Sequence, residues 1–269
     1  MKLVSSAKLR KAQNAIEAMR PYEEQLLGIL ASLQGGTAGV SSLNLGKNKD
    51  ERKTIVAIAS NSSLCGGFNA NAIAKVRAIR RPGDTVYAIG RKMADAMRKE
   101  GFASPEDFSA LSEHPSYGPA AALVEKLVAD VEAGRTGAVV LVYNHFVSTA
   151  RQEPVVEVLM QRETPDQAGG DRGVEERDSS PAPSYIAPLL EPSRAALLEA
   201  LVPKTRKLKL YAALLDSAAA EHAARAVAMQ TATDNAENLL SELTLQYNKG
   251  RQQKITSEIL DLAGGQAEN

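Results

Sequence analysis

Cysteine and tryptophan are nearly missing from this chain. Cys65 is the single cysteine and there is no tryptophan, which excludes an internal disulfide and any metal site built from several cysteines. One free thiol fits a reducing compartment. The sequence also has no signal-peptide pattern and no apolar run with the length of a membrane-spanning helix. We therefore expect any work at a membrane to proceed through a partner protein.

A net charge is also missing. Lys and Arg number 32, and Asp and Glu number 32 as well, so no overall field attracts a nucleic acid or an anionic membrane, and we expect neither as a direct partner. The segment before Pro21 is nevertheless basic. Its charged residues are Lys2, Lys8, Arg10, Lys11, Glu17 and Arg20. Such a face is either solvated or a track for an acidic partner.

The C-terminal segment lacks helix breakers. From Lys204 to Asn269 there is no proline, and Gly250 is the only glycine before Gly264. This predicts one helix, and at ~1.5 Å per residue it would extend on the order of 90 Å from Lys204 to Leu262, more than a domain of this size spans. Such a helix needs a partner along its length.

Apolar residues at coiled-coil spacing predict a seam on this helix and on a second helix at the other end of the chain. The C-terminal seam contains Leu208, Tyr211, Leu215, Ala218, Met229, Ala232, Ala236, Leu239 and Leu243, interrupted by His222 and Arg225. The N-terminal seam contains Ala12, Ala15, Met19, Tyr22, Leu26, Ile29 and Leu33, with Pro21 expected to kink it. The simplest arrangement pairs the two helices antiparallel. The alternative is that each packs separately on a globular body.

Between these helices, strand and helix patterns alternate. Short β-branched runs predict strands at 53–60, 85–90, 137–146 and 155–160. Helical patterns lie between the first three strands, at 70–80, 91–100 and 117–133. This alternation predicts a Rossmann-like α/β domain with a mostly parallel sheet. Only Glu153-Pro154 is expected to separate the last two strands, which predicts an antiparallel hairpin.

The expected fold class is thus α/β, with a long antiparallel coiled coil of the terminal helices added to the sheet domain. We expect an N-terminal helix and linker at 1–50, a globular foot domain at 51–190, and the long C-terminal helix at 191–269. Residues 164–183 break all periodicity and contain a Gly-Gly pair, prolines and serines, which predicts a mobile surface loop in the foot.

One glycine-rich segment, SLCGGFN at 63–69, lies where a phosphate-binding loop would sit. Its spacing matches neither the dinucleotide fingerprint nor the P-loop pattern. We therefore interpret Cys65, Gly66 and Gly67 as a tight strand-to-helix turn. A nucleotide-dependent enzyme built on the sheet is the alternative.

Catalysis by the Cys65 thiol would need a nearby base. The candidates, His114, His145 and His222, lie on three separate elements with no recognisable spacing. We expect a half-buried structural thiol, and we expect no catalytic residue, cofactor or metal site in the chain.

Several longer strings are highly specific. They are MKLVSSAKLRKAQ at 1–13, LCGGFN at 64–69, EHAARAVAM at 221–229, ATDNA at 232–236 and LQYNKGRQ at 245–252. In this order, and over nearly the whole chain, they closely resemble the gamma subunit of F-type ATP synthases.

The resemblance implies that the terminal helices form a shaft that turns inside a hexamer of alternating α and β subunits. The α/β domain would be its foot, beside the epsilon subunit and the c-ring of Fo. The chain would not be catalytic: its asymmetric surface would set the nucleotide state of each β subunit in turn, so that proton-driven rotation becomes ATP synthesis. The expected position is peripheral, on the cytoplasmic face of a bacterial inner membrane, attached only through Fo.

The resemblance also implies contacts with loops of the β subunits. On the upper C-terminal helix they would fall on Arg225, Gln252, Thr256 and Glu258. Arginine can grip a carboxylate with a fork of donors, and residues four apart share a helix face. Lys2, Lys8 and Lys11 are expected to meet acidic β-subunit loops through a screened attraction that permits rotation. The alternative for both sets is ordinary solvation.

Family members carry further residues ahead of the segment that matches Met1. We therefore expect a shortened N-terminal helix, and an upper C-terminal helix without a partner along its last turns. A coiled-coil adaptor that merely tethers its partners is the remaining alternative to a rotor.

Overall fold

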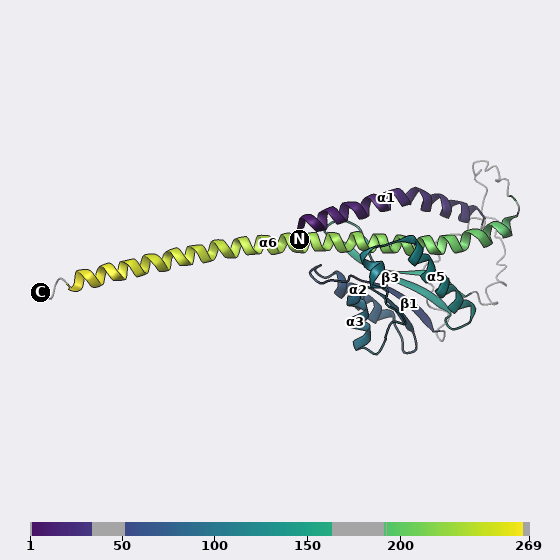
Figure 1. Cartoon of the computed structure of the whole chain (residues 1–269), viewed down its shortest axis with the longest axis horizontal. Helices are drawn as coiled ribbons and strands as arrows, with labels where there is room; N and C mark the ends of the chain where they lie inside the picture. The colour runs from purple at the N-terminus through teal and green to yellow at the C-terminus, as the bar shows by residue number, and fades with distance from the viewer. Residues whose placement is uncertain (1, 34–51, 163–190, 192, 266–269) are drawn as a thin grey trace, which may run out of the picture.

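The computed structural model describes residues 2–33, 52–162, 191 and 193–265. Two long helices, α1 (Lys2–Leu33) and α6 (Arg194–Gly265), lie side by side against an α/β domain, and α6 continues far beyond it (Figure 1). The predicted surface loop at 164–183 lies outside the described residues.

Four strands form one sheet in the order β2-β1-β3-β4. The strands are β1 (Lys53–Ile58), β2 (Thr85–Ile89), β3 (Ala138–Phe146) and β4 (Gln152–Gln161). β1 runs parallel to β2 and β3, and β4 runs antiparallel to β3. The predicted fold class, a mostly parallel sheet combined with a long C-terminal helix, is confirmed.

The expected position of the hairpin turn is wrong. Pro154 does not separate the strands but lies within β4, opposite Asn144. β4 is an edge strand, where a residue without an N–H can be accommodated because one side of the strand needs no partner. The turn is instead formed by residues 147–151, in which the Arg151 amide donates to the Ser148 carbonyl at 3.2 Å.

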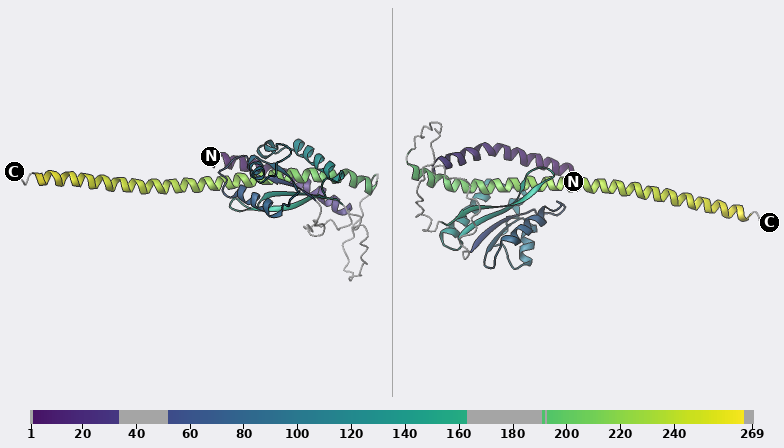
Figure 2. Two further views of the ribbon diagram at one scale, coloured as in Figure 1. Left: turned by 90° about the horizontal axis from the view of Figure 1, so that it is seen from below. Right: turned by 180° about the vertical axis from the view of Figure 1, so that it is seen from behind.

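Helices cover both faces of the sheet (Figures 1 and 2). They are α2 (Phe68–Ile79), α3 (Arg91–Lys99), the short α4 (Ser109–Glu113), which the sequence pattern did not indicate, and α5 (Tyr117–Glu132). On one face, Ile55 and Val86 pack against α2 and α3. On the other, Val56 and Leu141 pack against α5 and α6. α6 is therefore part of the core of the foot.

Both helices tolerate an internal proline. α6 begins at Arg194 rather than Lys204 and includes Pro203, because the preceding AALLEAL segment has high helix propensity. α1 is curved but continuous through Pro21 (Figure 1).

Candidate functional site

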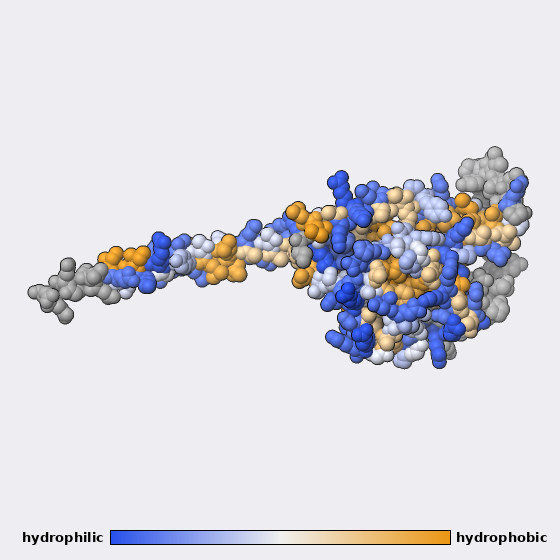
Figure 3. Space-filling model, viewed as in Figure 1, coloured by the Kyte–Doolittle hydropathy of each residue, from blue (hydrophilic) through white to orange (hydrophobic). Residues whose placement is uncertain are grey.

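The C-terminal half of α6 leaves the foot as an unaccompanied helix (Figures 1 and 2). Every residue from Thr231 to Leu260 is exposed, over a length of about 45 Å. The large apolar side chains among them are Leu239, Leu240, Leu243, Leu245, Tyr247, Ile255, Ile259 and Leu260. They form apolar patches along the rod in Figure 3. Apolar exposure on this scale marks a surface that binds another protein.

The predicted seam divides where α1 begins. Below this level, Leu9 of α1 packs against Ala219 and Ala223 of α6. Above it, Leu239 and Leu243 are 56% and 53% exposed. The upper seam therefore has no partner within the described residues, and it is free to bind one from another chain.

Gln252 and Thr256 lie together on this free helix. The Thr256 hydroxyl donates to the Gln252 carbonyl at 2.8 Å, one turn earlier. Glu258 is exposed on the next turn. The structure thus presents these three polar side chains to the surroundings of the rod.

Arg225 lies elsewhere, at the base of the free helix. Its side chain is only 15% exposed. One Nη donates to the Ser63 carbonyl at 2.8 Å, and the other pairs with the Glu221 carboxylate. Burial raises the pKa of Glu221, and the Arg225 guanidinium opposes that shift. The fork of donors expected to grip a carboxylate of a partner is therefore occupied within the chain.

Ser63 belongs to the loop between β1 and α2, which the Asn69 side chain holds together. Asn69 accepts a hydrogen bond from the Ser60 amide at 3.0 Å and donates to the Cys65 sulfur at 3.2 Å. Cys65 is 1% exposed, not half-buried as expected, and packs with Phe68 against Ala220 and Ala224 of α6. The loop is thus bound to the shaft.

Leu64, at the tip of this loop, has a φ of +67° and is 62% exposed. Gly66 also has a positive φ, of +56°, which a glycine adopts without strain. For leucine, the left-handed conformation costs about 1–2 kcal/mol. Neither Ser63 nor Leu64 was singled out from the sequence, because no local pattern signals a strained leucine.

The basic residues Lys2, Lys8 and Lys11 are all exposed on α1. Lys8 lies close enough to His222 of α6 to contribute to its titration. Burial, with smaller effects of Lys8 and Arg225, lowers the pKa of His222 to about 4. The buried Nδ1 of His222 has no hydrogen-bond partner. His222 is therefore held neutral between the helices.

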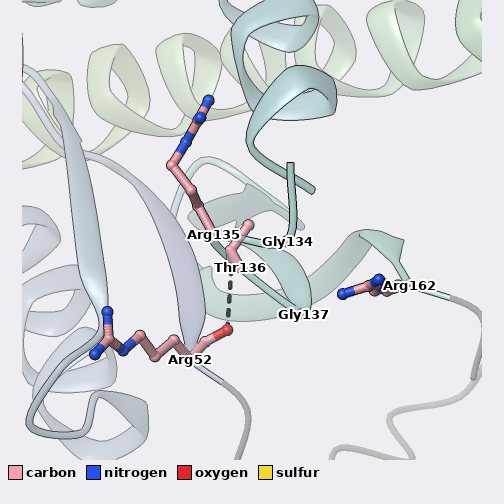
Figure 4. A pocket seen from close by; sticks show the side chains of 6 residues that line it. All are labelled: Arg52, Gly134, Arg135, Thr136, Gly137 and Arg162. Atoms are coloured by element: carbon pink, nitrogen blue, oxygen red, sulfur yellow. Dashed lines mark hydrogen bonds between the residues drawn. The ribbon is translucent and has the colours of Figure 1, made fainter. Parts of the chain in front are cut away.

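A shallow pocket lies at the opposite end of the foot, where β1 and β3 begin (Figure 4). Three arginines line it, Arg52, Arg135 and Arg162, but their guanidinium groups point in different directions. Arg135 is bound to Asp130, with Nε donating at 2.8 Å. The arginines therefore do not converge on one anion.

The described residues carry little that suggests metal chemistry or membrane insertion. Among them, no three His, Cys, Asp or Glu side chains form a group that could hold a metal ion. None of the helices in the described ranges combines the length and apolar character that crossing a membrane requires.

Solved structures of similar shape come from ATP synthases. A chain in the Euglena gracilis mitochondrial ATP synthase, from a structure of OSCP, F1 and c-ring, matches with a TM-score of 0.62 and 21% identity over 97% of this chain and 94% of that one. A chain in the Tetrahymena thermophila mitochondrial central stalk and c-ring matches with a TM-score of 0.60 and 18% identity, covering 87% and 97%. At this identity the likeness concerns the fold.

Sequence comparison is more specific. The ATP synthase family model matches residues 1–267. The chain is 43% identical to the ATP synthase gamma chain of Phocaeicola vulgatus and 42% identical to that of Bacteroides fragilis, covering 98% of this chain and 91% of each relative. The protruding helix, the foot and these similarities agree: the chain belongs to the family of ATP synthase gamma chains.

Proposed function

We propose that this chain is the central rotor shaft of an F-type ATP synthase, which couples proton-driven rotation of the c-ring to cycling of the catalytic β subunits. The observation that carries the proposal is a helix with one end anchored and the other free. Leu210 and Leu214 of α6 are almost completely buried in the core of the foot, while the helix beyond Thr231 is exposed. Torque applied to the foot would therefore pass directly into α6.

α1 braces the lower part of the shaft. Leu9, Leu26 and Leu33 are buried along its length, and Leu9 packs against Ala219 and Ala223 of α6. The small alanine side chains let the two helices approach closely. A paired rod resists bending better than one helix, so the base of the shaft can transmit torque without folding back.

The free helix presents a different surface on each side. Leu239 and Leu243, four residues apart, share one side, and Gln252 and Thr256 share another. As such a rod turns, each surrounding subunit meets different side chains. Coupling then arises because the rod angle changes the relative free energies of the conformations of its neighbours, without any contact with nucleotide.

The detailed assembly is also part of the proposal. The α and β subunits would enclose the free helix, with β-subunit loops contacting Gln252, Thr256 and Glu258, and with Arg225 acting at its base. The epsilon subunit and the c-ring would bind the foot. The chain itself would have no catalytic site, consistent with a Cys65 loop that is filled by its own side chains.

We also propose the location and the division of the chain. Gamma chains of bacteria are its similar relatives, which supports a peripheral position on the cytoplasmic face of a bacterial inner membrane, through Fo. The division into a helix and linker at 1–50, a foot at 51–190 and a shaft at 191–269 follows the observed elements.

The test is a reversible lock between shaft and ring. A cysteine replaces the exposed Ser257, a second cysteine is placed in the facing β-subunit loop, and ATP turnover of the assembled complex is measured. Oxidation should stop turnover, and reduction should restore it. Ser257→Cys without the second cysteine is the control and should turn over normally under both conditions.

The same experiment separates the rotor from the two alternatives. An adaptor that only tethers its partners would keep its turnover when locked, which would contradict the proposal. A nucleotide-dependent enzyme would show saturable ATP binding by the isolated chain in calorimetry, and the rotor should show none.

A further inference from the structure

We infer that the exposed side chain of Leu64 anchors a docking surface for an acidic loop of an F1 subunit, at the point where the shaft leaves the foot. Leu3 and Val4 of α1 and Val227 of α6 complete this surface, and we call the four residues the neck surface. The inference rests on the proposed function and adds to it a contact at the base of the shaft.

The conformation of Leu64 is the first observation. Among the described residues it is the only one other than glycine with a positive φ. Glycine or asparagine would form the same turn with less strain. Because the side chain is 62% exposed, burial within the chain does not compensate for the strain. A leucine at this position is explained by an apolar contact with another molecule.

The chain holds Leu64 firmly from both sides. On one side, the Ser63 carbonyl accepts a hydrogen bond from Arg225 at 2.8 Å. On the other, Cys65 is buried against α6, and its sulfur accepts a hydrogen bond from Asn69 at 3.2 Å. The strained residue is therefore fixed to the shaft and cannot relax by moving the loop. A pre-organised apolar side chain is what a docking site requires.

The other members of the neck surface lie at the same level. Cys65 packs against Ala220 and Ala224, and Val227 follows one turn later. The loop and the first turn of α1 both lie where α6 leaves the foot (Figures 1 and 2). Leu3, Val4 and Val227 are 83%, 58% and 41% exposed. Exposed apolar side chains thus come together from three segments of the chain.

The surrounding charge indicates an acidic partner. Lys2, Lys8 and Lys11 are exposed on α1, which has no acidic residue before Glu17. The carboxylate of Glu221 is already paired with Arg225. Glu113 of α4 is the carboxylate that acts on Glu221 from the foot side. An apolar patch beside a row of lysines fits a loop that carries carboxylates next to an apolar side chain.

The test uses the full chain reconstituted with the α and β subunits of F1. Leu64→Gly removes the side chain and also relieves the strain. We expect its melting temperature to stay the same or rise, while its affinity for the F1 subunits falls about tenfold. Leu64→Asn, which also tolerates the turn, should show the same loss. The control is Leu27→Ala, which removes an exposed leucine of α1 away from the neck and should change neither quantity.

Two results would overturn the inference. If Leu64→Gly binds F1 as tightly as the wild-type chain, the side chain has no partner. If Leu64→Gly melts at a lower temperature, the leucine has a structural role. Added salt should weaken binding of the wild-type chain more than that of a Lys2→Gln/Lys8→Gln variant, and equal salt dependence would exclude the acidic partner. If the wild-type chain fails to assemble at all, the proposed function fails as well.

Discussion

Arg225 on α6 donates a hydrogen bond of 2.8 Å from Nη1 to the backbone carbonyl of Ser63, which precedes it by 162 residues in the chain. Its second Nη pairs with Glu221, one helical turn earlier. A single guanidinium therefore neutralises a buried carboxylate and joins the loop of the foot to the shaft. This joint lies where the supported part of α6 ends.

Arg225→Ala should destabilise the chain, because it leaves the Glu221 carboxylate buried without its partner and the Ser63 carbonyl without its donor. We expect a loss of about 2–4 kcal/mol in the free energy of unfolding, measured by urea denaturation. The double variant Glu221→Gln/Arg225→Ala should recover part of this loss, since the charge that needed the partner is gone. Equal stability of Arg225→Ala and the wild-type chain would contradict the structure.

His222 should make the chain less stable in mild acid. Its pKa is lowered to about 4 in the folded chain and is near 6.5 when unfolded, so the unfolded state binds more protons between these values. The His222 contribution is therefore complete above about pH 6.5 and is lost as the pH falls toward 4. Glu221, whose pKa burial raises, acts in the opposite direction.

The comparison that isolates His222 is the difference in unfolding free energy between the wild-type chain and His222→Gln, followed from pH 7 to pH 4. This difference should shift against the wild-type chain as the pH falls. A difference that stays constant with pH would mean that His222 is not held neutral between the helices.

Leu214 anchors the shaft in the foot. It is 1% exposed in the core that α6 shares with the sheet, so Leu214→Ala should leave a cavity and cost about 2–5 kcal/mol in urea denaturation. Leu240, which is 67% exposed on the free helix, is the matched control. Leu240→Ala should change the stability of the isolated chain by about 0.5 kcal/mol or less. Similar losses for both would contradict the division of α6 into anchored and free parts.

Gly90, between β2 and α3, should not tolerate a side chain. Its φ is +99°, and an added Cβ would lie 2.1 Å from the carbonyl oxygen of Ala59, a backbone atom that cannot move aside. Gly90→Ala should therefore lose about 3 kcal/mol or more. Gly118→Ala, in open space on α5, should be neutral or slightly stabilising. Thermal melting of the two variants provides the measurement.

The elements of the foot were predictable because their signals are local. The β-branched runs that became β1 and β3 and the helical pattern that became α5 each lie within one element, so periodicity alone indicated them. The errors occurred where a neighbour decides. Pro154 is tolerated within β4 because β4 is at the edge of the sheet, and strand order is not encoded in any single strand.

For the shaft, the sequence by itself determined that two amphipathic helices exist at the ends of the chain and that residues 245–252 carry a specific family string. Only the tertiary structure decided where their pairing ends, that Arg225 is bound to Ser63, and that Leu64 is strained and exposed. The physical reason is distance along the chain: helix propensity and periodicity act over a few residues, whereas these contacts join segments that approach each other only after the foot has folded.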